Sequence, residues 1–175
     1  MARNIAKLLV ENDYDGVDID WEYPGDDGYD AGQDWQYHTY LLADLREELA
    51  GTGMSISIAA TVFYKMPWHE VSDQVDFLNT MSYDSQEANH ASMWLFQNDC
   101  SNHCHSFLKM PKVKIVGGLP FYSNVQGAIY DQVGWAGIVS QIPNLSPSAN
   151  EGKLNGGSGL TMHSFNGPNL IKEKA

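Results

Sequence analysis

Three carboxylates recur at every second position in the segment 16–22. It reads Gly-Val-Asp-Ile-Asp-Trp-Glu, so that Asp18, Asp20 and Glu22 alternate with large apolar residues. Side chains two positions apart lie on the same face of a β-strand, and we therefore predict that the three acids share one face of a strand over 16–22. Carboxylates placed in this way can supply a general acid and partners for the groups that react with it.

A row of acids is unfavourable in a folded protein unless it serves a purpose. Neighbouring negative charges disfavour joint ionisation, and burial disfavours ionisation altogether. The alternative interpretation is that the acids lie on a solvated edge strand or bind a hard cation. We favour a working site because Val17, Ile19 and Trp21 predict a strand whose other face is covered by helices. Trp21 is accordingly expected in the core.

The elements around this strand alternate between helix and strand. Apolar spacing predicts helices over 3–11, 37–49, 69–75, 94–108 and 169–175, and strands over 54–62, 76–83 and 113–121. A long segment rich in Gly, Asn and Ser precedes the last helix. With the strand at 16–22, four strands alternate with helices, which predicts an α/β fold with a parallel sheet: an open doubly wound sheet or a closed (β/α)8 barrel.

In a barrel, Glu22 would be the carboxylate nearest the C-terminal mouth, where barrel enzymes carry their chemistry. Asp20 lies one layer deeper, and its negative charge favours the protonated form of Glu22 that a general acid requires. Glu22 is therefore our candidate acid.

Composition predicts a globular protein and excludes some partners. The chain has 175 residues, 43% of them hydrophobic, and a formal net charge of −12; one domain over 1–175 is expected at this length. Such a charge repels phosphate backbones and anionic lipids, so neither nucleic acid nor membrane is an expected partner. No signal peptide is expected, because Arg3 and Lys7 lie in an amphipathic stretch.

Two cysteines could in principle bind a metal. Cys100 and Cys104 are poorly placed for a disulfide on a helix, and His103 and His105 lie beside them. The full ligand spacing of a zinc module is absent, so we expect no metal site here.

Three motifs resemble glycoside hydrolase family 18. The run Asp-Gly-Val-Asp-Ile-Asp-Trp-Glu over 15–22 is similar to the family's D-G-x-D-x-D-x-E on the fourth barrel strand, and its Trp-Glu-Tyr-Pro continuation resembles the chitinase branch. Met-Ser-Tyr-Asp over 81–84 resembles the M-x-Y-D that ends strand six, and Gly-Leu-Pro-Phe-Tyr over 118–122 resembles the G-x-P-F-Y that ends strand seven.

The resemblance implies a mechanism in which Glu22 protonates the leaving oxygen and the substrate's own 2-acetamido group is the nucleophile. Asp20 would hold the acetamide N–H, Asp18 would share a proton or hydrogen bond with Asp20, and Tyr83 would align the acetamide carbonyl. No cofactor or metal is implied. The residues expected to line the −1 sugar pocket are Met81, Asp84 and Tyr122. Other aromatic residues offer faces for sugar stacking, with no preference among them: Trp35, Tyr64, Trp68, Trp94 and Trp135.

The resemblance covers about strands four to seven of the eight barrel strands. It therefore implies a partial (β/α)8 TIM barrel that forms a single incomplete catalytic domain. The implied substrate is chitin or a chitooligosaccharide, cleaved at β-1,4 bonds between N-acetylglucosamine units; the alternatives are a chitin-binding module without turnover and a truncated fragment. Open edges at 16–22 and 113–121 predict a homo-oligomer, unless the sequence is part of a longer product. Members of this family are usually secreted.

Overall fold

The computed structural model describes residues 1–25, 31–60, 68–107 and 110–175. The chain divides into two compact units. The first comprises residues 1–80 and 101–116, and the second comprises residues 81–100 and 117–175. No helix within the described ranges is long and apolar enough to cross a membrane.

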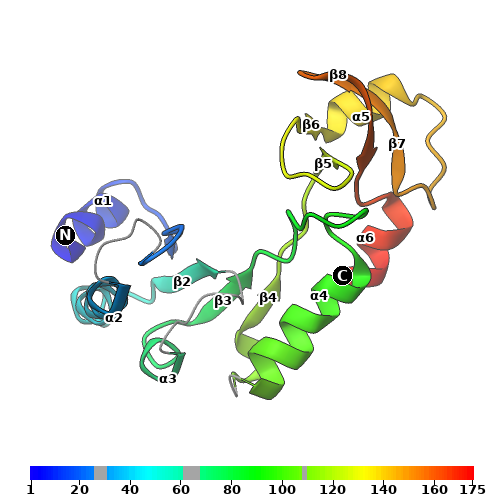
Figure 1. The fold of residues 1–175 in the computed structure, drawn as a ribbon. Helices are drawn as coiled ribbons and strands as arrows, with labels where there is room; N and C mark the ends of the chain where they lie inside the picture. Colours follow the sequence, from blue (N-terminus) through cyan, green and yellow to red (C-terminus); the bar gives the residue numbers. More distant parts are fainter. Residues whose placement is uncertain (26–30, 61–67, 108–109) are drawn as a thin grey trace. The chain divides into compact units, whose positions relative to one another are not determined.

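A parallel sheet organises the first unit (Figure 1). Its four strands lie in the order β1-β2-β3-β4. They are β1 (Gly16–Ile19), β2 (Ser55–Ala60), β3 (Phe77–Thr80) and β4 (Ile115–Gly117). The helices are α1 (Ala2–Glu11), α2 (Ala31–Glu48) and α3 (Trp68–Val71), with the π-helix η1 (Asn98–Phe107) and the 3₁₀ turn η2 (Lys112–Lys114) further along the chain.

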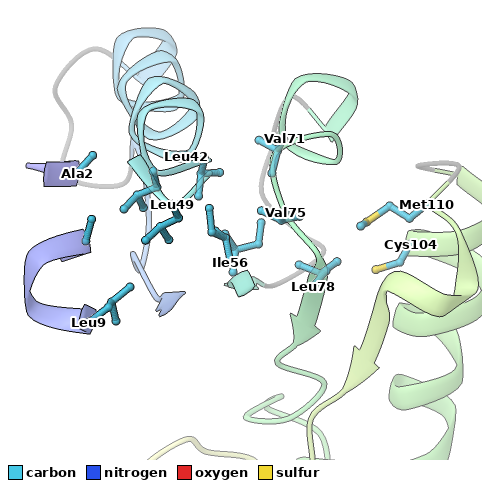
Figure 2. Packing of buried hydrophobic residues seen from close by; sticks show 13 residues of the cluster. Ala2, Leu9, Leu42, Leu49, Ile56, Val71, Val75, Leu78, Cys104 and Met110 are labelled. Carbon is cyan, nitrogen blue, oxygen red and sulfur yellow. The ribbon is translucent and has the colours of Figure 1, made fainter. Parts of the chain in front are cut away.

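The core of this unit lies between the helices and one face of the sheet. Helix α2 contributes Leu42, Leu45 and Leu49, whose three- and four-residue spacing forms one apolar stripe. Figure 2 shows Leu42 and Leu49 near Ile56 of β2, with α1 adding Ala2 and Leu9. The remaining buried members are Ala6, Ile58, Val71, Val75, Leu78, Cys104 and Met110.

An antiparallel sheet organises the second unit, in the strand order β6-β5-β8-β7. Its strands are β5 (Tyr122–Val125), β6 (Val133–Gly134), β7 (Glu151–Gly156) and β8 (Gly159–Ser164). Helix α5 (Trp135–Gln141) covers it through a small core of Ile138, Leu154 and Phe165. Helix α6 (Pro168–Lys174) packs against α4 (Met93–Gln97) (Figure 1).

The predicted α/β fold with four parallel strands is confirmed, but the number of strands is wrong. The Gly-, Asn- and Ser-rich segment folds into β5 to β8 and α5, so the described residues contain eight strands. Periodicity missed β7 and β8 because they read Glu-Gly-Lys-Leu-Asn-Gly and Gly-Leu-Thr-Met-His-Ser, with few β-branched or aromatic residues. The helix predicted over 94–108 continues past α4 as η1. The single catalytic domain stays a prediction.

Candidate active site

The carboxylate row is only partly a strand. Asp18 lies in β1, whose pairing with β2 ends at Ile19, so Asp20 and Glu22 follow the strand and do not belong to it, contrary to the predicted range 16–22. The three acids are solvent-exposed in this chain, and the Glu22–Tyr23 peptide bond is cis. The row therefore begins on a paired strand and continues into the segment at its C-terminal end.

Asp18 is fixed by side chains of the next two strands. Ser57 of β2 donates its hydroxyl to Asp18 Oδ1 at 2.5 Å, and Asn79 of β3 donates its amide to the same oxygen at 2.7 Å. Ser57 is directly opposite Asp18 in the parallel register and is buried. Sequence analysis missed both partners, because their contact depends on strand register.

Trp21 is not a core residue, contrary to prediction. It is 39% exposed, and its ring lies 6.0 Å from that of His38 on α2. Beyond the end of β1 the alternation of faces no longer applies, so Trp21 covers His38 at the surface. Burial lowers the pKa of His38 to about 4, so this ring is neutral near pH 7.

A second group of predicted site residues gathers around Asp84. Met81, Tyr83 and Asp84 follow β3, and Tyr122 begins β5. The hydroxyl of Tyr122 donates to both carboxylate oxygens of Asp84, at 2.9 and 2.8 Å. The rings of Tyr83 and Tyr122 meet edge to face at 6.2 Å. The structure thus brings Tyr83, Asp84 and Tyr122 together.

Two further side chains contact Asp84 and were missed. Asn124 donates its amide to Asp84 Oδ1 at 2.6 Å, and His90 Nδ1 lies 3.3 Å from the same oxygen. Burial raises the pKa of Asp84, but hydrogen bonds from His90, Tyr122 and Asn124 outweigh it and hold that pKa below the ordinary value. Asp84 is therefore a carboxylate at neutral pH. Asn124 follows the recognised motif by two residues on the same strand, which was the available signal.

The structure describes only some of the other candidates. Among the described residues no group of His, Cys, Asp and Glu could hold a metal, and Cys100 and Cys104 do not form a disulfide. The side chains of His103, His105 and Trp68, together with Tyr64, lie outside the described residues. Trp35 is buried, whereas Trp94 is 63% exposed. Trp135 packs beside the small core of the second unit.

The two groups of acidic and aromatic residues fall within one family's sequence model. The model described as glycosyl hydrolases family 18 matches residues 1–152. The chain belongs to this family. Family 18 membership was predicted from the three motifs, and it is confirmed.

Known chitinases resemble the chain over part of their length. Endochitinase 1 of Metarhizium anisopliae is 28% identical over 149 residues, which cover 70% of this chain and 34% of that protein. A crystal structure of a chitinase from Bacteroides thetaiotaomicron, 27% identical, superposes with a TM-score of 0.76 over 99% of this chain and 55% of the other. A chitinase catalytic domain of Ostrinia furnacalis in complex with penta-N-acetylchitooctaose, 18% identical, has a TM-score of 0.72 over 99% of this chain and 58% of the other. The chain spans about half of these two solved chitinase chains and about a third of the endochitinase.

Proposed function

We propose that this chain carries the acid and the acetamide-aligning residues of a chitinase-type glycosidase that hydrolyses β-1,4 bonds between N-acetylglucosamine units. The observation that carries the proposal is the family 18 carboxylate row at the end of β1, with Asp18 held by Ser57 and Asn79. An aspartate anchored by two neutral donors stays in place while the acids beyond it exchange protons.

Each residue has a task in this proposal. Glu22 gives its proton to the leaving glycosidic oxygen as the bond between that oxygen and the anomeric carbon breaks, and the oxygen of the sugar's 2-acetamido group attacks the anomeric carbon. Water then opens the cyclic intermediate, and the Glu22 carboxylate takes a proton from that water. Asp20 accepts the acetamide N–H and balances the positive charge of the cyclic intermediate, with Asp18 behind it. Tyr83 donates to the acetamide oxygen, and Met81, Asp84 and Tyr122 contact the −1 sugar. The mechanism needs neither a metal nor a cofactor.

The second candidate is chitooligosaccharide binding without turnover. It is favoured by one observation, which is that the chain spans only about half of the solved chitinase chains that it matches. Binding tolerates the absence of neighbouring barrel strands better than catalysis does, because catalysis requires the reacting groups to be held in a narrow range of positions.

The test is hydrolysis of a fluorogenic chitooligosaccharide by the wild-type chain and by Glu22→Gln. Turnover is expected to fall by at least about a hundredfold in this variant, since general acids contribute roughly 10²–10⁴ in rate. The matched control is Glu11→Gln at the exposed end of α1, which should keep wild-type turnover. Saturable binding by a wild-type chain that shows no turnover would favour the second candidate, and the absence of both binding and turnover in the wild-type chain would refute the two proposals.

We also propose that the chain self-associates through its parallel sheet. Strands β1 and β4 are the two edges of that sheet, and unpaired edges pair with other chains. Light scattering should therefore give a mass above the 19.5 kDa of one chain. A single monodisperse species of one-chain mass at all concentrations would contradict this proposal.

A further inference from the structure

Asp84 adopts a backbone conformation that must be held in place. Its φ is +60°, in the left-handed region that residues other than glycine seldom occupy. Its carboxylate is also half-buried, so it needs hydrogen-bond donors from the protein in place of water. The residue therefore needs support from outside its own strand end.

His90 supplies that support from within the loop 85–92. Its Nδ1 lies 3.3 Å from Asp84 Oδ1 and 3.3 Å from the backbone nitrogen of Asp84. The imidazole ring is fully buried and lies 5.5 Å from the ring of Tyr122, with 35° between the planes. One side chain thus touches the carboxylate, the backbone and the tyrosine that donates to Asp84.

The position of His90 is itself fixed by other elements of the second unit. Its backbone N–H donates to Ser164 Oγ on β8 at 3.1 Å, and its carbonyl accepts the N–H of Ser85 at 3.0 Å. The carbonyl of the next residue, Ala91, accepts the ammonium of Lys174 on α6 at 2.5 Å. The loop is therefore tied to a strand and a helix on either side of the imidazole.

The partners of Nδ1 indicate which ring nitrogen carries the proton. Nδ1 can accept from the Asp84 N–H or from the Asn124 amide, each 3.3 Å away, or it can donate to the Asp84 carboxylate, but it cannot both accept and donate. A hydrogen bond to an ionised acceptor is about twice as strong as a neutral one, so the proton belongs on Nδ1. Asp84 then receives donors from His90, Tyr122 and Asn124.

We propose that His90 is a positioning residue of the −1 site, which donates from Nδ1 to Asp84 and holds Asp84 and the neighbouring Tyr83 in the orientation that faces the sugar. This inference deepens the proposed function and rests on it for its consequence in catalysis. The hydrogen bond itself can be tested without any turnover.

The first test follows the ionisation of Asp84 by carbon-detected NMR of its carboxyl group in wild type, His90→Phe and His90→Asn. Phenylalanine keeps a ring beside Tyr122 but has no donor, whereas the asparagine amide can place a donor where Nδ1 lies. The apparent pKa of Asp84 should rise by about one unit, a tenfold change in its ionisation constant, in His90→Phe and stay near wild type in His90→Asn. An unchanged value in His90→Phe, or equal rises in both variants, would overturn the proposal.

A second measurement needs no substitution and remains decisive if the variants fail to fold. Nitrogen NMR of wild-type His90 distinguishes a protonated Nδ1 from a protonated Nε2. The proposal expects the proton on Nδ1, and a neutral ring protonated only on Nε2 would overturn it.

The contribution of His90 to catalysis is tested by comparing KM between the wild-type chain and the His90 variants. In the fluorogenic assay His90→Phe should raise KM by about tenfold, and His90→Asn should restore most of the loss; equal KM values in wild type and His90→Phe would overturn the catalytic part. An inactive wild-type chain would instead reject the proposed function, and the two NMR tests would still decide the role of His90.

Discussion

Asp18 and Asp84 show how much of this site depends on residues outside the motifs. Each is an acid in a recognised family 18 motif, and each is held by amides or hydroxyls from neighbouring strands. Asp18 is bound by Ser57 and Asn79, and Asp84 is bound by Tyr122 and Asn124. The motifs supply the acids, while strands further along the chain supply most of the donors that orient them.

Removing a donor from Asp18 should impair turnover more than stability. We expect Asn79→Ala to lower kcat/KM by about tenfold, because a hydrogen bond to a charged group contributes roughly 1.5–3 kcal/mol and this one is partly exposed. Asn79→Asp should lose more, since it places a second negative charge beside Asp18. The fluorogenic assay measures both variants, with circular dichroism as the check on folding. Full turnover in Asn79→Ala would show that Ser57 alone suffices.

At the scale of elements, β1 depends on a close approach to β2. A Cβ added at Gly16 would overlap the backbone carbonyl of Ser55, and Gly16 is the register partner of Ser55. The strand that carries Asp18 is thus packed against β2 through a residue without a side chain. The Gly of the D-G-x-D-x-D-x-E motif has this steric role here.

Gly16→Ala should destabilise the chain by about 1–3 kcal/mol, the usual range for overpacking, because the contact is with backbone that cannot rotate away. Gly134→Ala is the matched control: it has open space around the added Cβ and a φ of −64°. Urea unfolding monitored by far-ultraviolet circular dichroism measures both. Equal stability of Gly16→Ala and wild type would mean that β1 shifts freely along β2.

Strand β7 is an edge of the antiparallel sheet, and a side chain covers part of it. The Gln141 carboxamide accepts the N–H of Asn155 at 2.7 Å and donates to its carbonyl at 3.5 Å, as a neighbouring strand would. Gln141→Ala should speed hydrogen exchange of the Asn155 amide and cost about 1 kcal/mol. Gln141→Glu keeps the acceptor and should protect that amide better than alanine does. Unchanged exchange in the alanine variant would contradict the capping role.

At the scale of the whole molecule, ionised aspartates make stability depend on pH. Burial raises the pKa of Asp76 and of Asp84, but their donors lower both below the ordinary value; for Asp76 these are the Ile56 N–H and Arg46. The hydrogen bond from the Ser158 N–H lowers the pKa of Asp131. A lowered native pKa means that the unfolded chain binds protons first, so this stabilisation is present above about pH 4 and is lost as pH falls through the native values.

The free energy of unfolding in urea should therefore be lower at pH 3 than at pH 6. Asp76→Asn should flatten this dependence, because the asparagine cannot titrate, and it should also lower stability at pH 6, because Arg46 loses its negatively charged partner. A free energy of unfolding that is the same at both pH values in wild type would contradict the prediction.

Sequence alone determined the family, the helix and strand alternation of the first unit, and which acids are candidates for the site, because each of these follows from contiguous residues at fixed spacing. Tertiary structure decided the rest. Ser57 reaches Asp18 across 39 positions, and Asn79 across 61, so only strand register brings them together. The antiparallel sheet of β5 to β8 was missed because its strands are held by pairing with one another and carry little apolar alternation of their own. Strand β1 ends after Ile19, where its pairing with β2 ends, and Trp21 beyond that point is exposed. The local sequence pattern holds no information about where two strands stop pairing.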